Sequence, residues 1–196
     1  MKKVLYIDCC IRREESQTKK LADYFLEQIA DNEKYEIETL CLMDEPLQFM
    51  SEGFFQQRER LLAEGNLNHH RFRYAHQFAE ADKIVVAAPL WDLMFPALLK
   101  VYLENLCVEG ITFGVGEQGL CGLCKADHMV FITTRGSFYE GSPMEMGSRY
   151  MGAMAEFFGI ENYDCIFAEG LDLGIKPVEQ LLEEAHPLAD KVAAKF

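Results

Sequence analysis

The chain has 196 residues, of which 49% are hydrophobic and 26% charged. These proportions are ordinary for a globular protein, and the length suits one well-buried core, so we expect a single domain over residues 1–196. The formal net charge is −13. Because nucleic acid and an anionic membrane surface would both repel such a chain, functions on either partner are disfavoured, and we interpret the acidity as maintaining solubility.

The cellular compartment is indicated by the apolar runs and the cysteines. No apolar run approaches the ~20 residues that a transmembrane helix needs. The N-terminal MKKVLYIDCC has a short apolar stretch followed by Asp8, which is typical of a strand rather than a signal peptide. The seven cysteines are odd in number and scattered, which fits reduced thiols better than a disulfide framework. We therefore expect a cytoplasmic protein.

Short apolar runs that predict strands alternate along the chain with amphipathic stretches that predict helices. The expected strands are Val4–Ile7, Tyr35–Leu42, Ile84–Ala88, Met129–Thr133 and the end of a strand at Cys165–Ala168. The expected helices are Ser16–Ile29, 52–64, 69–81, Ala97–Cys107, Glu145–Phe158 and a C-terminal helix that Pro177 opens and that carries Leu181, Leu182, Ala185 and Leu188. The glycine-rich span Gly110–Gly122 is predicted to be an excursion or lid. This alternation predicts an α/β fold in three layers, doubly wound around a parallel sheet.

The turn that follows the third predicted strand is the most informative segment. Ile84–Ala88 is wholly apolar, as suits a strand buried on both faces, and the turn after it reads Pro89-Leu90-Trp91-Asp92-Leu93. In an open α/β sheet, ligands bind outside the carboxyl ends of the strands. The turn offers flat apolar surface and backbone amides, which favours a planar aromatic ligand, with a flavin as the leading candidate.

A phosphate site is one of two interpretations of Ser16–Thr18 (Ser-Gln-Thr), where the first helix begins. A helix N-terminus has unsatisfied N–H groups that favour an anion, and two hydroxyls add donors. The other interpretation is a plain cap at Ser16. Arg12 or Arg13 could pair with a phosphate, whereas Glu14 and Glu15 would oppose one by ~1 kcal/mol each. Neither GxGxxG nor a P-loop occurs, which disfavours a Rossmann site or a nucleoside triphosphatase.

A second ligand-contacting loop is predicted after the fourth strand, at Thr134-Arg135-Gly136-Ser137. Gly136 permits close backbone approach, so its amide and that of Ser137 could donate to a ligand carbonyl. Arg135 could add charge there or form a surface salt bridge.

The Cys-x-x-Cys at Cys121 and Cys124 lies in the glycine-rich span, where a thioredoxin-like pair would not be expected. We interpret these cysteines as incidental thiols. A redox-sensitive pair, or half of a zinc site completed by Cys107 and His128, are the alternatives. We expect no metal.

In this order and spacing, these segments resemble the FMN-dependent NADH-azoreductase and NAD(P)H:quinone oxidoreductase family of flavodoxin-like proteins. The likeness covers essentially the whole chain. It is carried by KVLYI, the SQT helix start, the turn 88–93, LLKVYLENL, Gly110–Phe113, Thr134–Ser137, Phe158–Ile160 and Phe167–Gly170. The resemblance implies a flavodoxin-like fold whose five strands are ordered 2-1-3-4-5.

The resemblance also implies a site for FMN. Its phosphate would be held by Cys10, Ser16, Gln17 and Thr18, and its ring would lie between Pro89, Leu90, Trp91, Asp92 and Leu93 on one side and Thr134, Arg135, Gly136 and Ser137 on the other. Phe113 and Phe158 would wall a substrate pocket at a homodimer interface. Tyr139 could hydrogen-bond to the acceptor, and the alternative is an ordinary core or surface aromatic. No catalytic residue follows from the likeness.

The implied activity is the transfer of two electrons from NADH or NADPH, through FMN, to a quinone, an azo compound or a related small aromatic acceptor. Two departures from the family pattern keep alternatives open. Position 10 is Cys where Ser is usual, and Asp92 stands in place of an amide and cannot donate a hydrogen bond unless protonated. The alternatives are a flavodoxin-type electron carrier and a flavin-free binding or sensor protein that kept the fold.

Overall fold

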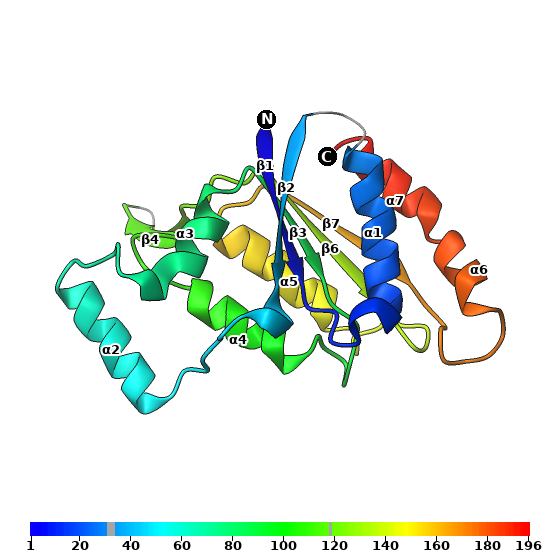
Figure 1. The fold of residues 1–196 in the computed structure, drawn as a ribbon, viewed down its shortest axis with the longest axis horizontal. Helices are drawn as coiled ribbons and strands as arrows, with labels where there is room; N and C mark the ends of the chain where they lie inside the picture. Colours follow the sequence, from blue (N-terminus) through cyan, green and yellow to red (C-terminus); the bar gives the residue numbers. More distant parts are fainter. Residues whose placement is uncertain (31–33, 118) are drawn as a thin grey trace.

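The computed structural model describes residues 1–30, 34–117 and 119–196. Its main sheet has five parallel strands, namely β1 (Lys2–Asp8), β2 (Tyr35–Cys41), β3 (Lys83–Ala87), β6 (His128–Thr134) and β7 (Asn162–Ala168). Their order is β2-β1-β3-β6-β7 (Figure 1). In chain order these strands are the first to the fifth of the sheet, so the predicted arrangement 2-1-3-4-5 is confirmed.

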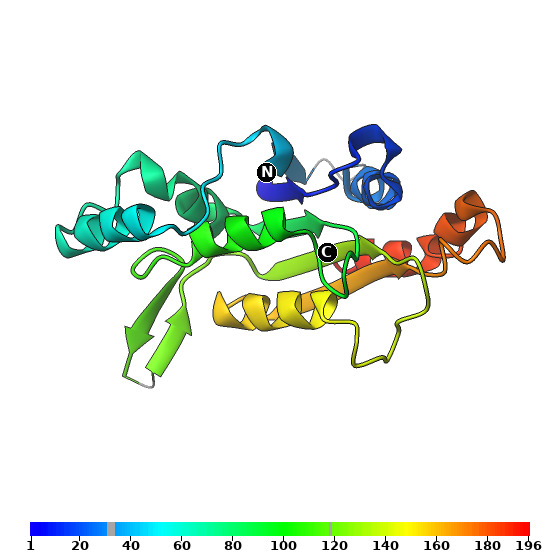
Figure 2. The ribbon, with the colours of Figure 1, turned by 90° about the horizontal axis from the view of Figure 1, so that it is seen from below.

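Helices cover both faces of the sheet. They are α1 (Gln17–Ala30), α2 (Glu52–Ala63), α3 (Arg73–Glu80), α4 (Ala97–Leu106), α5 (Gly147–Phe157), α6 (Val178–Glu183) and α7 (His186–Ala193). The view along the sheet shows three layers, with α1, α6 and α7 packed on one face and α3, α4 and α5 on the other (Figure 2). The three-layer α/β fold predicted from the alternation of elements is thus confirmed.

The core is built from strand residues that alternate between the two faces. In β1, Leu5 and Ile7 pack with the α3–α5 layer, whereas Val4 and Tyr6 pack with α1 and α7. Every residue of β3 and β6 is buried because both faces of these strands are covered, which explains their continuous apolar runs. On α1, Phe25 is fully buried in this core, and a side chain of that size contributes roughly 1.5–3 kcal/mol on burial.

Two predicted helices differ from the observed ones. The C-terminal helix is broken into α6 and α7, because Pro187 has no N–H to bond the carbonyl of Glu183, where α6 ends. The helix expected over 69–81 begins with a 3₁₀ turn, His70–Phe72, before α3. Further 3₁₀ turns lie at Arg13–Glu15 and Leu42–Asp44.

The glycine-rich span folds into a hairpin that leaves the body of the molecule (Figure 2). It pairs β4 (Phe113–Gly116) with β5 (Gly119–Gly122) in antiparallel register. Its base is tightly packed, since a Cβ at Gly122 would lie 2.0 Å from the backbone at Phe158 and Gly159. The predicted excursion is therefore present, and its strands were not foreseen.

None of the helices in the described ranges is both long and apolar enough to cross a membrane.

Candidate functional site

A cavity of about 300 Å³ opens at the carboxyl edge of the main sheet, where the loops that follow β1, β3, β6 and β7 meet. It is lined by Arg12, Ser16, Gln17, Thr18, Pro89, Leu90, Trp91, Thr134, Arg135, Gly136, Leu171, Asp172 and Val178. The three loops expected to bind a cofactor thus come together. Main-chain hydrogen bonds extend the sheet into them, for example from the Leu90 amide to the Thr134 carbonyl at 3.0 Å.

The start of α1 forms the polar end of this cavity. Ser16 is buried and its Oγ accepts a hydrogen bond from the Lys19 amide at 3.3 Å, so it caps the helix. Thr18 Oγ1 lies 2.6 Å from Thr134 Oγ1, which places two hydroxyls side by side. Gln17 Oε1 is buried without a partner among the described residues. First-turn amides of a helix also have no intrahelical acceptor, so this end offers the donors that a phosphate requires.

The turn after β3 is a tight two-residue hairpin. Trp91 and Met94 exchange main-chain hydrogen bonds of 2.6 and 2.9 Å, and the residues between them have positive φ, 51° at Asp92 and 68° at Leu93. Positive φ at both central positions is the type I′ pattern. Pro89, Leu90 and Trp91 line the cavity. Asp92 and Leu93 do not line it, and both are exposed to solvent.

The loop after β6 presents backbone donors. The amides of Gly136 and Ser137 have no acceptor within residues 1–30, 34–117 and 119–196. Gly136 lines the cavity and Ser137 does not. A Cβ at position 136 would lie 2.1 Å from Asp172 Oδ2, so the carboxylate occupies the space that any larger residue would need. The Gly136 amide is therefore open to a ligand in this cavity, whereas the contact expected from Ser137 stays a prediction.

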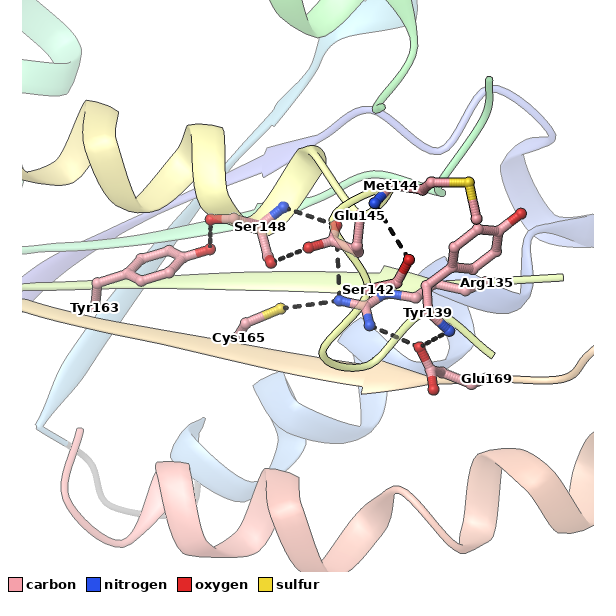
Figure 3. Close-up of polar contacts among 9 residues, drawn as sticks. All are labelled: Arg135, Tyr139, Ser142, Met144, Glu145, Ser148, Tyr163, Cys165 and Glu169. Carbon is pink, nitrogen blue, oxygen red and sulfur yellow. Dashed lines mark hydrogen bonds and ion pairs between the residues drawn. The ribbon is translucent and has the colours of Figure 1, made fainter. Parts of the chain in front are cut away.

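Arg135 lies in a buried ionic cluster (Figure 3). Its guanidinium is 2.7 Å from Glu169 and 3.7 Å from Glu145, and it stacks 4.4 Å from the ring of Phe167. One cation between two carboxylates leaves the cluster with a net charge of −1. Arg135 is thus neither a surface ion pair nor a free positive charge for a ligand, and its contacts hold the loop in place.

A second cavity, of about 490 Å³, lies beside the first, between β7 and the loop that leads into α5. Arg135 lines both cavities. Tyr139 lines only this second one, and its amide donates to Glu169 Oε1 at 2.9 Å. Glu169 thereby fixes both ends of the segment from Arg135 to Tyr139 (Figure 3).

Cys10 does not line the first cavity. Its side chain is fully buried, with Sγ 3.8 Å from the Ala87 carbonyl, and its amide is held by Asp8 at 2.8 Å. Burial raises the pKa of the thiol well above its ordinary value. The side chain of Cys10 is therefore packed in the core, and its contact with a phosphate stays a prediction.

The two phenylalanines expected at a substrate pocket between two protomers are packed against other aromatic rings of their own chain. Phe158 is fully buried and packs against Phe78, with ring centroids 5.0 Å apart, because it ends α5 facing the core. Phe113 belongs to the hairpin and packs on Phe157 at 4.9 Å. Within one chain, neither residue lines either cavity.

The Cys-x-x-Cys pair has no assembled site around it. Cys121 is exposed on the hairpin, whereas Cys124 is half buried and its burial raises the pKa of the thiol to about 12. Such a thiol is not a thiolate at neutral pH. In the part of the chain that the structure describes, no group of three His, Cys, Asp or Glu side chains could hold a metal ion.

Some lining residues were missed. Leu171, Asp172 and Val178 come from the segment after β7, and Arg12 was only one of two candidate arginines. Arg13 instead binds Asp44 at 2.7 Å. These residues follow predicted strands, which is the one feature of the sequence that could have indicated them. A single sequence does not show which side chains of a loop point into the cavity.

Comparisons with known proteins agree with this geometry. A family model described as "Flavodoxin-like fold" matches residues 2–192. The FMN-dependent NADH:quinone oxidoreductase 2 of Clostridium acetobutylicum is 41% identical over 201 residues, and an FMN-dependent NADH:quinone oxidoreductase of Clostridium perfringens is 40% identical over 198; each alignment covers 100% of both chains. The crystal structure of an azoreductase from Bacillus anthracis superposes with a TM-score of 0.88 at 28% identity and full coverage of both chains.

The chain belongs to the flavodoxin-like family. The order of its strands and the loops that meet at the carboxyl edge of the sheet agree with this class. The curated relatives that cover its whole length carry the name FMN-dependent NADH:quinone oxidoreductase.

Proposed function

We propose that the protein is an FMN-dependent oxidoreductase that transfers two electrons from NADH to a quinone, an azo compound or a related small aromatic acceptor. The observation that carries the proposal is the cavity at the carboxyl edge. It joins a donor-rich helix start to an apolar turn and to the Gly136 amide, which has no acceptor among the described residues. The relatives, named for FMN, NADH and quinone reduction, support the same chemistry.

The residues of the cavity fit FMN. The buried Gln17 Oε1 without a partner and the paired hydroxyls of Thr18 and Thr134 suit the hydroxyl and phosphate groups of the cofactor. Trp91 would supply apolar surface to the ring, and the Gly136 amide would donate to a ring carbonyl. When bound, FMN supplies the redox chemistry, while the protein binds it, orients it and sets its electrostatic surroundings.

The decisive experiment measures the visible spectrum of the purified protein with and without added FMN, followed by anaerobic stopped-flow mixing with NADH. We expect a bound-flavin spectrum that bleaches on mixing and recovers when a benzoquinone is added. A bound flavin that does not bleach over minutes would instead identify an electron carrier without its own reductase activity. Absence of any flavin binding would leave a binding or sensor protein.

Assembly and compartment follow from the same proposal. We propose a homodimer, because large apolar side chains such as Phe138 and Leu120 are 60% and 68% exposed and would be covered by a second copy. Each protomer would be one domain over residues 1–196.

A cytoplasmic location is supported by seven cysteines that form no disulfide among the described residues.

A further inference from the structure

Asp172 is an exposed acidic residue in the wall of the cavity, and no cation among the described residues pairs with it. It follows β7 and lines the cavity together with Gly136. Across the described ranges, its carboxylate has neither an ion pair nor a hydrogen-bond donor within contact distance. Two arginines line the same cavity. Arg135 is already paired with Glu169 and Glu145, and Arg12 is exposed and forms no ion pair with Asp172. The carboxylate of Asp172 therefore places a negative charge beside Gly136, in the loop after β6, and no positively charged side chain is paired with it in the described residues.

The position of this carboxylate is fixed by backbone contacts. The Asp172 amide donates to the Gly136 carbonyl at 2.9 Å, and the neighbouring Leu171 amide donates to the Arg135 carbonyl at 3.2 Å. These bonds join the segment after β7 to the loop after β6. Asp172 Oδ2 lies 2.1 Å from the place of a Cβ on Gly136, directly against that backbone. Only a residue without a side chain leaves room for the carboxylate there.

We propose that Asp172 lowers the reduction potential of the bound FMN and so makes it a stronger reductant toward the acceptor. This inference rests on the proposed function, in which the Gly136 amide would donate to a ring carbonyl of FMN. When NADH is oxidised to NAD⁺, a hydride passes to FMN and the cofactor gains one negative charge. A fixed carboxylate against the same loop disfavours that charge, whereas the oxidised ring is uncharged and is less affected.

The test is a spectroscopic redox titration of the FMN-loaded protein and of Asp172→Asn. One unit charge roughly 10 Å away, in an effective dielectric of ~20, changes the ratio of reduced to oxidised FMN affinity about tenfold. For a two-electron couple this is an upward shift of ~30 mV in the midpoint potential. Asp172→Ala, which also removes the charge but cannot hydrogen-bond, should shift the potential in the same direction.

The matched control is Glu179→Gln. Glu179 is exposed in the first turn of α6 and does not line the cavity, so this variant changes the net charge equally at a different place. The inference would be overturned if the midpoint potential of Asp172→Asn shifted no more than that of Glu179→Gln. It would also be overturned if Asp172→Asn shifted the potential and Asp172→Ala did not. If the wild-type protein fails to bind FMN or to be reduced by NADH, the proposed function itself fails, so the two outcomes are distinguishable.

Discussion

Ser16 has two tasks at the start of α1, since it caps the helix and lies in the wall of the cavity. The double variant Ser16→Ala/Thr18→Ala should weaken FMN binding by roughly 1–3 kcal/mol, because charge-assisted hydrogen bonds to the phosphate are lost. Titration of flavin fluorescence with protein measures this.

Ser51→Ala is the matched control for Ser16. Ser51 also caps a helix, with Oγ accepting from the Phe54 amide at 3.4 Å, but α2 does not contribute to the cavity. This variant should destabilise its helix by about 1 kcal/mol and leave FMN affinity unchanged. Equal FMN affinity in the double variant and the wild type would show that the phosphate binds elsewhere.

His128 gives a pH-dependent stability. It is buried, and burial lowers the pKa of its imidazole below the usual value of 6.5 despite the Asp164 carboxylate 2.8 Å away. The unfolded chain therefore binds the proton more readily than the folded one. The contribution of His128 is fully present above pH ~6.5 and is lost as the pH falls below it, with a slope of at most about 1.4 kcal/mol per pH unit.

Urea unfolding of the wild type and of His128→Gln between pH 5 and 8 checks this expectation. The glutamine variant keeps a hydrogen-bonding side chain beside Asp164 but cannot titrate, so its unfolding free energy should fall less as the pH is lowered from 7 to 5. Parallel pH profiles for the two proteins would contradict the assignment.

At the scale of elements, the β4–β5 hairpin packs on the rest of the molecule where Gly122 meets Gly159. Gly122→Ala would place a Cβ 2.0 Å from the backbone at Gly159, so β5 or the end of α5 must move. We expect a loss of about 1–3 kcal/mol in unfolding free energy, measured by urea denaturation. Gly53→Ala is the control, since nothing lies within 4 Å of its added Cβ on α2 and alanine favours the helix. Equal stability of the two variants would contradict the tight contact.

The turn between β3 and α4 shows what sequence reasoning could and could not reach. The apolar run and Pro89 were enough to predict a buried strand followed by a ligand-contacting turn, because burial and strand ends are local signals. The left-handed backbone at Asp92 and Leu93 could not be foreseen, since leucine disfavours that conformation by roughly 1–2 kcal/mol. It is imposed by the paired main-chain bonds of Trp91 and Met94.

At the scale of the molecule, the exposed apolar side chains of the hairpin allow the homodimer to be tested. Val115 and Leu120 pair across β4 and β5, and each is 68% exposed. Sedimentation equilibrium should give twice the 22.4 kDa of one chain for the wild type. Val115→Lys/Leu120→Lys should shift it toward the single chain if this surface is covered by a partner. A wild type that sediments as one chain at micromolar concentration would contradict the dimer.

The fold as a whole was accessible from the sequence because the order of strands and helices restricts the topology strongly. The sequence did not show which side chains point into the cavity and which into the core. Cys10 follows β1 as expected, yet its thiol turns into the core, and Asp172 was missed although it lines the cavity. Both outcomes depend on the orientation of a single side chain. Tertiary packing determines that orientation, and the local composition of the sequence does not.

The cavity draws its lining from Arg12 near one end of the chain to Val178 near the other. During synthesis, the amino-terminal part of a protein emerges and begins to fold first. The helix start that suits a phosphate is therefore made early, but the wall that contains Asp172 exists only after β7 has emerged and paired with β6. Retention of the cofactor would then report that the polypeptide has been made and folded at least through β7 and the segment after it, and chains released before that point would remain colourless.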